Sequence, residues 1–318
     1  DDMSIRIWNQ SGECLNVFTS HKDAVTDCKF CPSDLKKLVS SSLDGTLKYW
    51  DVFSSKLVYT YQDAVPESLL NVKGIKSISW SMNGEKLCYG CRNGDVAIVS
   101  VHQHEMILES KWNAHNGQVT SCLIAENNLL SASVEDKTFR VWNIYTLEEV
   151  LRKVGEPLQI SLLTNDQYSH TRNAFTSTMI DSIDNNESIK PGTASNSTAV
   201  VLLRDSATGM KVVSLSSIGP LYNETDPTVL NETRGDTVTA CAISRSTVVH
   251  ATSKGDLRVY NRYTGKPVGS GVLCGHMTDV TAIAFSDDET VLVSGGSDGT
   301  IRLWNPRPLS AIDQKFAD

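Results

Sequence analysis

Short apolar segments separated by turn sequences run along the whole chain. In residues 276–304 (HMTDVTAIAFSDDETVLVSGGSDGTIRLWN), three runs rich in Val, Ile, Thr and aromatic residues are separated by SDDE and SDG. Polar stretches of this kind, with Gly, favour turns. In the last run Ile301 and Leu303 alternate with Arg302 and Trp304, which is the period of a half-buried strand. The pattern predicts a three-stranded antiparallel meander closed by tight hairpins.

The same meander recurs along the chain. Residues 21–51 and 115–143 repeat it, and each of the three copies opens on a His and closes on a Trp, with an Asp six positions before that Trp. Another such pair, Asp2 and Trp8, stands at the start of the sequence. One meander alone cannot bury both of its faces, so we expect repeated meanders that stack on one another.

The copies resemble the WD-repeat family of β-propellers, in which each blade is a four-stranded sheet and a His, a Ser or Thr, an Asp and the Trp form a hydrogen-bonded tetrad. The resemblance implies an all-β fold, a seven-bladed β-propeller of four-stranded antiparallel blades, with the first blade incomplete in this chain. A buried indole N–H, hydroxyl, imidazole and carboxylate each cost free energy unless they are paired, which gives the tetrad a structural role. The residues that match it are His21, Ser40, Asp44 and Trp50, then His115, Ser131, Asp136 and Trp142, then His276, Ser294, Asp298 and Trp304. An extra residue in the second hairpin leaves Ser133 as an alternative to Ser131.

We interpret residues 1–318 as a single propeller domain cut from a longer protein. The blades are expected at residues 1–20 (partial), 21–61, 72–110, 115–153, 156–215, 236–273 and 276–316. Three blades lack the tetrad, because Val99, Arg204 and Tyr260 take the position of the closing Trp. In the fifth blade we assign LQISLLT and NAFTSTMI to the first two strands and STAVVLLRD to the third.

Composition limits the classes of partner. The net charge is −8, the pI is about 5.4 and no cluster of Lys and Arg is longer than two residues, so nucleic acid is not expected as a direct partner. No run of 18 apolar residues occurs, so no membrane span is predicted. We expect a cytoplasmic protein, with the nucleus left open.

Eight cysteines include two Cys-x-x-Cys pairs, CKFC and CYGC, which could be read as a zinc site. The pairs are much further apart than the halves of such sites usually are. In the aligned repeats Cys28 and Cys122 occupy the position of Ile78 and Ile283, which is typical of a small core residue. We therefore expect no metal, no cofactor and no disulfide, in a reducing compartment.

Combinations of Ser, His and Asp could also indicate a hydrolase. The set recurs three times with a Trp, lacks a Gly-x-Ser-x-Gly elbow and is explained by folding alone. The sequence contains no Gly-rich phosphate loop, no His-Glu-x-x-His and no acidic calcium loop. We predict that the chain is not an enzyme.

The remaining candidate for function is the upper face, where the second-to-third strand turns and the connections between blades open. We expect insertions 62–71, 181–197 and 216–234 on this face, either as binding loops or as disordered segments. The family resemblance assigns shorter positions to the same face: Ala24, Thr26, Leu43, Lys76, Arg92, Gln118, Thr120, Glu135, Thr237, Thr239, Ser253, Asp279, Thr281 and Ser297. For the threonines, β-propensity is the favoured explanation over contact with a peptide, whereas Lys76, Arg92 and Glu135 are favoured as partner contacts.

The sequence thus predicts a non-catalytic scaffold that binds a peptide or a protein domain, or other domains of the same parent protein, on its upper face. The repeats resemble those in the propeller region of larger nucleotide-binding oligomerising proteins of the apoptotic-protease-activator or telomerase-associated type. An alternative is a substrate receptor of a cullin-type ubiquitin ligase, because WNPR at Trp304–Arg307 resembles the W-D-x-R signature of that class. A hydrolase is the third possibility.

Overall fold

The computed structural model describes residues 2–9, 11–62, 74–102, 105–125, 127–164, 197–205, 209–218, 221–224, 228–230, 237–286 and 289–305. The regular elements of this part of the chain are all β-strands. No helix among these residues is long and apolar enough to cross a membrane.

The strands form antiparallel sheets in chain order, as follows. The first sheet is β1 (Ser4–Trp8) and β2 (Cys14–Thr19). The next is β3 (Val25–Cys31), β4 (Asp34–Ser42), β5 (Thr46–Asp51) and β6 (Lys56–Gln62). The third is β7 (Ile75–Trp80), β8 (Lys86–Cys91), β9 (Asp95–Val101) and β10 (Met106–Asn113). The fourth is β11 (Ser121–Ala125), β12 (Asn128–Ser133), β13 (Thr138–Asn143) and β14 (Glu149–Val154). The fifth is β15 (Glu156–Thr164), β16 (Ser197–Asp205), β17 (Gly209–Ile218), β18 (Leu221–Glu224) and β19 (Thr228–Val229). The sixth is β20 (Val238–Ile243), β21 (Thr247–Thr252), β22 (Asp256–Asn261) and β23 (Pro267–Cys274). The last is β24 (Val280–Phe285), β25 (Leu292–Gly296) and β26 (Ile301–Trp304).

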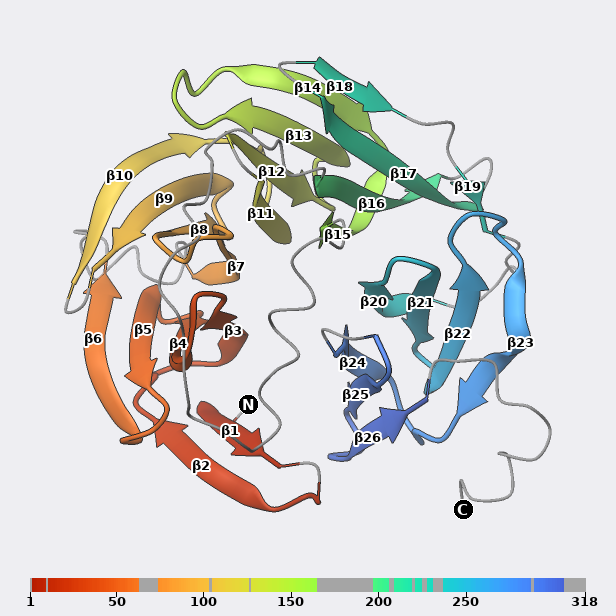
Figure 1. The fold of residues 1–318 in the computed structure, drawn as a ribbon, viewed down its shortest axis with the longest axis horizontal. Coiled ribbons are helices and arrows are strands. Elements are labelled where there is room, and N and C mark those ends of the chain that lie inside the picture. Colours follow the sequence, from red (N-terminus) through yellow and green to blue (C-terminus); the bar gives the residue numbers. More distant parts are fainter. Residues whose placement is uncertain are drawn as a thin grey trace, which may run out of the picture.

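These sheets stand around a common centre as the blades of a propeller (Figure 1). The first strand of each later sheet, such as β3, β7, β11 and β20, lies nearest the centre, and the last strand, such as β6, β10 and β23, lies at the rim. Apolar residues on both faces of the sheets produce this arrangement, because a sheet with two apolar faces can cover them only with neighbouring sheets. The predicted all-β propeller of four-stranded antiparallel blades is confirmed.

The predicted number of complete blades differs from the observed one. Among the described residues five sheets have four strands or more, while β1–β2 has two strands and β24–β26 has three. The sequence pattern repeats in seven sheets, but the first and the last of them have fewer than four strands.

Our assignment of the fifth blade was wrong. β15 pairs with β16 directly, from Glu156 opposite Arg204 to Thr164 opposite Ser197, and β16 pairs with β17. STAVVLLRD is therefore the second strand, and Arg204 lies beside a second-to-third strand turn instead of in the closing strand. The misassignment arose because the R-D-x-x-T-G pattern mimics the end of a third strand. NAFTSTMI lies outside the described residues.

Thr164 ends the first strand and Ser197 begins the second, so these two residues lie at the end of the blade opposite the upper face. The rest of insertion 181–197 lies outside the described residues. Residues 216–234 differ too, since β17 extends to Ile218 and β18 and β19 pair with it to form the outer edge of the fifth sheet. Insertion 62–71 lies outside the described residues except for Gln62, the last residue of β6.

The core lies between adjacent sheets. Alternate residues of a third strand pack against the preceding and the following sheet, as β5 shows. Trp50 packs with Ile5 and Phe18 of the preceding sheet, and the Phe18 and Trp50 ring centroids are 5.1 Å apart. Leu47 and Tyr49, on the opposite face of β5, pack in the core shared with the following sheet. The residue at the Trp position thus faces the preceding blade, and the residue before it faces the following one.

Hydrogen bonds also link neighbouring blades near the centre. The Thr26 hydroxyl donates to the backbone oxygen of Ile75 in the next blade at 2.7 Å, and Thr239 does the same to Val280 at 2.5 Å. The Cys122 N–H donates to Ser77 Oγ at 3.1 Å. These bonds fix the rotation of one sheet against the next, which apolar packing alone does not specify.

We expect Leu87→Ala to lower the free energy of unfolding by about 2–5 kcal/mol, because Leu87 is fully buried in the core shared by the β3–β6 and β7–β10 sheets. Chemical denaturation measures the change. The matched control is Leu57→Ala in β6, where the side chain is exposed and the expected loss is smaller. Equal losses in the two variants would contradict the assignment of the core to the space between blades.

Candidate functional site

Three blades contain a chain of buried polar side chains that runs from the upper face into the sheet. In the β3–β6 blade, His21 Nδ1 lies 3.0 Å from Asp44 Oδ2, and His21 Nε2 lies 2.7 Å from Ser40 Oγ. The Trp50 indole N–H donates to the same Ser40 Oγ at 2.8 Å. The serine hydroxyl therefore joins a residue before the first strand to one in the third strand.

The other two sets have the same geometry. His115 lies 2.9 Å from Asp136 and 2.8 Å from Ser131, and Trp142 donates to Ser131 at 2.9 Å. The structure thus places Ser131, and not Ser133, in this set. In the last blade the corresponding distances are 3.0 Å to Asp298, 2.6 Å to Ser294 and 2.7 Å from Trp304.

A fifth member of each set escaped the sequence analysis. The hydroxyls of Thr46, Thr138 and Thr300 donate to Oδ1 of the Asp two residues earlier, at 2.6, 2.8 and 2.7 Å. Each hydroxyl also lies within 3.3 Å of Nδ1 of the His. The signal was present, because Thr stands two positions after the turn Asp in all three copies.

This network favours the ionised carboxylate. Burial on its own raises the pKa of Asp44, but hydrogen bonds from His21, from the Thr46 hydroxyl and from backbone N–H groups hold that pKa below its ordinary value. Burial also raises the pKa of Asp136, but hydrogen bonds from Thr138 and His115 hold that pKa below its ordinary value. Burial lowers the pKa of His115, although Asp136 opposes the shift.

The geometry does not suit hydrolysis. Ser40 and Ser131 are 0% exposed and Ser294 is 1% exposed, so a substrate cannot reach their hydroxyls. Each hydroxyl is also occupied by an indole N–H on one side and an imidazole on the other. Among the described residues, no group of three or more His, Cys, Asp and Glu side chains could hold a metal ion.

Two blades without the tetrad fill its space differently. In the β7–β10 blade Asn93 stands in the turn and bonds to Asp95 at 2.8 Å, while Val99 is fully buried in the core. In the β20–β23 blade Tyr260 stacks on His250, with ring centroids 5.3 Å apart and an interplanar angle of 20°. In both blades the residue at the Trp position is packed in the core.

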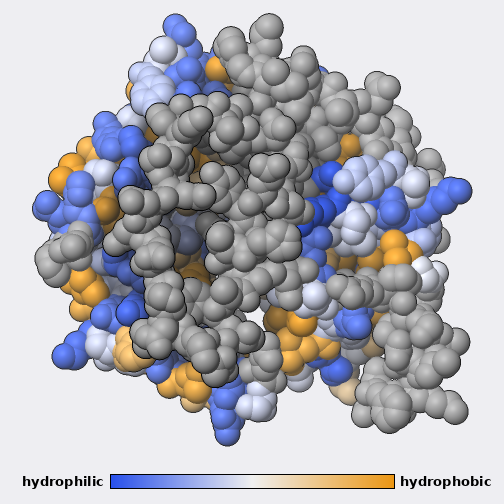
Figure 2. All heavy atoms as spheres, viewed as in Figure 1, coloured by the Kyte–Doolittle hydropathy of each residue, from blue (hydrophilic) through white to orange (hydrophobic). Residues whose placement is uncertain are grey.

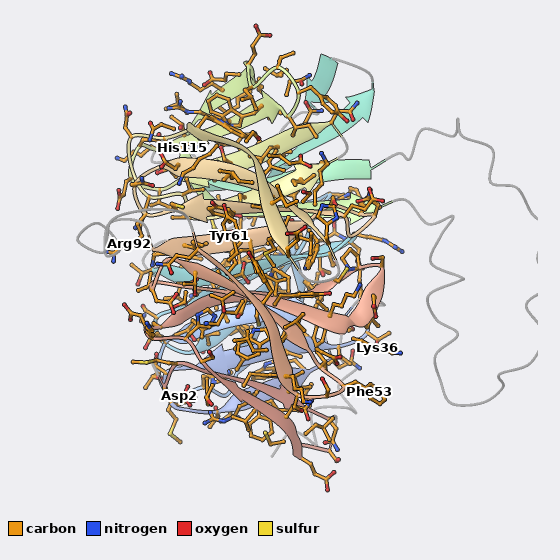
Figure 3. All side chains as sticks on the ribbon, turned by 90° about the vertical axis from the view of Figure 1, so that its left-hand side faces the viewer. Asp2, Lys36, Phe53, Tyr61, Arg92 and His115 are labelled. Atoms are coloured by element: carbon orange, nitrogen blue, oxygen red, sulfur yellow. The ribbon has the colours of Figure 1, made fainter. Side chains whose placement is uncertain are left out.

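The upper face is the one at which the His and Asp ends of these sets lie. Arg92 and His115 lie toward one side of the propeller in Figure 3, and Lys36 and Phe53 lie toward the opposite side. We call the second one the lower face. A cavity of about 310 Å³ lies on the lower face between the β3–β6 and β7–β10 blades, lined by residues that include Lys37, Tyr49, Trp80 and Glu85.

Most of the hydroxyls predicted on the upper face bond within the protein. The hydroxyls of Thr26 and Thr239 bond to neighbouring blades, as described above. Thr120 donates to the backbone oxygen of Ala132 and Thr281 to that of Gly295, each at 3.2 Å. Thr237 donates to the Ser253 hydroxyl at 2.7 Å. The backbones of Ala24, Leu43, Asp279 and Ser297 form the matching turn bonds, Leu43 N–H to Ala24 and Ser297 N–H to Asp279. These positions shape the face, and their hydrogen-bonding groups are largely occupied.

Four of the predicted residues lie on neighbouring strands of two adjacent blades. Ile75 pairs with Cys91, and the Arg92 N–H donates to the Gly74 carbonyl at 2.9 Å, so Lys76 and Arg92 belong to paired neighbouring strands. The Val119 N–H of the next blade donates to the Cys91 carbonyl at 3.0 Å, which brings Gln118 beside Arg92. The Gln118 N–H in turn donates to the Glu135 carboxylate at 3.0 Å. We define Lys76, Arg92, Gln118 and Glu135 as the charged patch.

The two cations of this patch are uncompensated. Arg92 is exposed and Lys76 is half-buried, and neither forms an ion pair within the described part of the chain. Several other cations in these blades are paired, as Lys86 is with Glu109 at 2.6 Å and Lys111 with Asp95 at 3.8 Å. The patch therefore offers a positive site beside one carboxylate.

We expect Ser131→Ala to lower the free energy of unfolding by about 1–3 kcal/mol, because the Trp142 indole N–H and His115 Nε2 lose a buried partner. Ser131→Thr keeps a hydroxyl and serves as the conservative control. Denaturant titration monitored by tryptophan fluorescence measures the loss. Unchanged stability in Ser131→Ala would contradict the structural role of the set.

Stability is expected to fall on acidification. The folded pKa values of Asp44, Asp136 and Asp298 lie below the unfolded value of about 3.9, so their contribution is complete above that pH and is lost as the pH falls below it. His115 also has a lowered pKa, so its contribution is complete above about pH 6.5 and begins to be lost below that pH. Urea midpoints between pH 8 and pH 3 measure both stages. A midpoint that stays constant from pH 5 to pH 3 would contradict the carboxylate assignment.

Comparison with known proteins agrees with this geometry. The model of the WD domain, G-beta repeat, matches residues 12–51 and 265–305, and the model of the anaphase-promoting complex subunit 4 WD40 domain matches residues 65–127. Apoptotic protease-activating factor 1 of Danio rerio is 25% identical over 95% of this chain and 24% of its own length. Protein ROOT INITIATION DEFECTIVE 3 of Arabidopsis thaliana is 25% identical over 87% of the chain and 57% of its own length.

A guanine nucleotide-binding protein subunit beta of Zea mays is 25% identical over 44% of the chain and 38% of its own length. The chain thus spans about a quarter to little more than half of these relatives. Repeat matches, similar relatives and the blade geometry agree, and together they support a WD-repeat β-propeller.

Proposed function

We propose that this propeller is a non-catalytic scaffold that binds a peptide or a protein domain on its upper face. The observation that carries the proposal is the charged patch, in which Lys76 and Arg92 form no ion pair among the described residues and the Glu135 carboxylate accepts the Gln118 N–H. Unpaired charges at a surface select a partner of complementary charge and speed its association. The partner segment is expected to place an acidic side chain against Lys76 and Arg92.

A protein partner suits this face better than a small molecule does. Proteins with WD repeats generally act as interaction scaffolds, which supports the same class of function. The rigid core between blades would hold the patch in one geometry, so little conformational entropy is lost on binding. The partner is either a separate protein or another domain of the same parent protein, in keeping with a match that covers only part of each relative.

A catalytic function is not supported. The serine hydroxyls of the tetrads are enclosed and doubly hydrogen-bonded, so none of these serines is open to a substrate as a nucleophile. For the ubiquitin-ligase alternative, Arg307 of the WNPR sequence lies outside the described residues. We retain a cytoplasmic location as part of the proposal, with the nucleus left open.

We also propose that the working ring has seven blades. The described sheets occupy seven positions around the centre, and the two incomplete ones, β1–β2 and β24–β26, are neighbours in the ring (Figure 1). Completion of the first sheet by two inner strands and of the last by an outer strand would give seven sheets of at least four strands each.

Charge reversal tests the binding proposal. We expect Arg92→Glu to weaken binding of the upper-face partner at least tenfold, about 1.4 kcal/mol. Quantitative pull-down with the full chain would compare the proteins retained by wild type and variant, and titration of the retained partner would then give the affinity. Glu135→Lys is expected to change both the affinity for the partner and the dependence of that affinity on salt concentration.

Lys56→Glu is the matched control, because Lys56 is exposed at the start of β6 and changes the net charge by the same amount on the lower face. Partner retention that fails equally in Lys56→Glu and Arg92→Glu would refute an upper-face site. Retention that survives both Arg92→Glu and Glu135→Lys would refute the charged patch.

A further inference from the structure

The cavity on the lower face has aromatic walls. Tyr49 and Trp80 both line it, and they are 3% and 8% exposed. The equivalent positions in two other blades carry aliphatic residues, which are Val141 and Val259 for Tyr49 and Ile124 and Ile243 for Trp80. Although the side chains here are larger, a space of about 310 Å³ remains between the two blades. A cavity of that volume lies at the lower end of the range for ligand sites.

One wall of the cavity comes from the β3–β6 blade. Val39 pairs with Tyr49, and Lys37 stands two residues before Val39, so Lys37 and Tyr49 project from the same face of the sheet. That face is turned toward the β7–β10 blade, because Val39 and Tyr49 both pack in the core that the two blades share. The Lys37 ammonium and the Tyr49 hydroxyl are therefore neighbours in this wall.

The opposite wall comes from the β7–β10 blade and is fixed by contacts with the first. The Trp80 indole N–H donates to the Lys29 carbonyl of the β3–β6 blade at 3.2 Å, which holds the ring in one orientation. Gly84 has a φ of 72°, and a Cβ added to it would overlap Ser33 Oγ, so the β7–β8 turn lies directly against the β3–β4 turn. The cavity is thus formed by parts of the structure that are already held in place.

The polar groups of the first wall are hydrogen-bond donors. Burial disfavours the charge on Lys37, but the Tyr49 oxygen and the Asp34 carboxylate hold the pKa of Lys37 above its ordinary value. Burial raises the pKa of the Tyr49 phenol, which therefore keeps its proton at neutral pH. Asp34 lies 3.5 Å from Lys37, whereas charged hydrogen bonds of this kind are usually about 2.7–2.9 Å long. The ammonium, with three donors, and the phenol can both donate to one further acceptor.

The surface around the cavity favours a small molecule over a broad protein contact. In Figure 2 the described residues at the left-hand edge, where Figure 1 places β6 and β10, mix hydrophilic and hydrophobic side chains. Faces that dock other proteins are more often marked by a contiguous apolar patch. A cavity with aromatic walls and a few polar groups is typical of a small-molecule site.

We propose that this cavity binds a small aromatic carboxylate. The carboxylate accepts hydrogen bonds from the Lys37 ammonium and the Tyr49 hydroxyl, and the ring packs against Trp80 and Val101. A single negative charge is expected, because this wall offers one ammonium, whereas phosphate sites usually gather Arg side chains or several backbone N–H groups. The site lies on the face opposite the charged patch, so it goes beyond the proposed scaffold function.

Fluorine NMR of the full chain tests the proposal, with para-trifluoromethylphenylacetate as the probe. Its amide has the same shape without the charge and serves as the neutral control. We expect the amide to bind at least tenfold more weakly, because it cannot form a charge-assisted hydrogen bond with Lys37. Absence of probe binding at millimolar concentration, or equal binding of acid and amide, would overturn the inference.

Two neighbouring lysines provide a matched pair of variants. Lys37→Gln removes the ammonium from the cavity, and we expect it to weaken probe binding at least tenfold. Lys36→Gln removes the same charge from the next residue of β4, whose ammonium lies over the Phe53 ring, 5.7 Å from its centroid, and should leave binding unchanged. Tyr49→Phe deletes only the hydroxyl and should weaken binding severalfold. Affinity that falls equally in both lysine variants, or in neither, would overturn the site.

A cavity-filling variant and two further probes complete the test. Val101→Phe places a ring in the cavity from the opposite wall and should abolish binding, with circular dichroism used to verify the fold. Full affinity in a folded Val101→Phe variant would place the probe elsewhere and overturn the inference. Tighter binding of para-trifluoromethylphenyl phosphate would overturn the carboxylate class. Tighter binding of a glycyl-glycyl-phenylalanine peptide, which presents a ring and a carboxylate at its end, would overturn a free small molecule as the occupant.

Discussion

The structure depends on one buried oxygen in each tetrad blade. The serine Oγ accepts the indole N–H from the third strand and lies beside the imidazole that precedes the first strand. In a medium of low dielectric an unpaired N–H or hydroxyl is costly, so only the register that pairs all of these groups is stable. A slip by one residue would turn Ser40 and Trp50 to opposite faces, and both would lose their partners.

Much of the fold could be predicted from the sequence because three blades carry this set at constant spacing. The four-stranded antiparallel blades follow from the period-2 alternation together with the turn residues. The fifth sheet was misread because no tetrad fixes its register, and the R-D-x-x-T-G sequence stands at a turn of another kind. Local sequence identifies a strand, but it does not identify which strand of a blade that segment becomes.

The contacts that individual side chains make on the upper face were harder to predict. Thr26 and Thr239 matched the rim positions, yet their hydroxyls are directed to the neighbouring blade, a contact that depends on how the sheets are packed. The charged patch was recognised residue by residue, whereas its continuity depends on the bond from Val119 to Cys91 between two blades. Sequence showed which charges were present, and packing decided which of them became neighbours.

The ends of β15 and β16 have a practical consequence. Thr164 and Ser197 are paired neighbours where the first strand of the fifth sheet meets the second, at the end of the blade opposite the upper face. A fluorescent protein spliced between these two positions would enter and leave the propeller at adjacent points. Such an internal label would report on the molecule in cells while the opposite side of the disc stayed accessible, and both chain ends would remain unmodified.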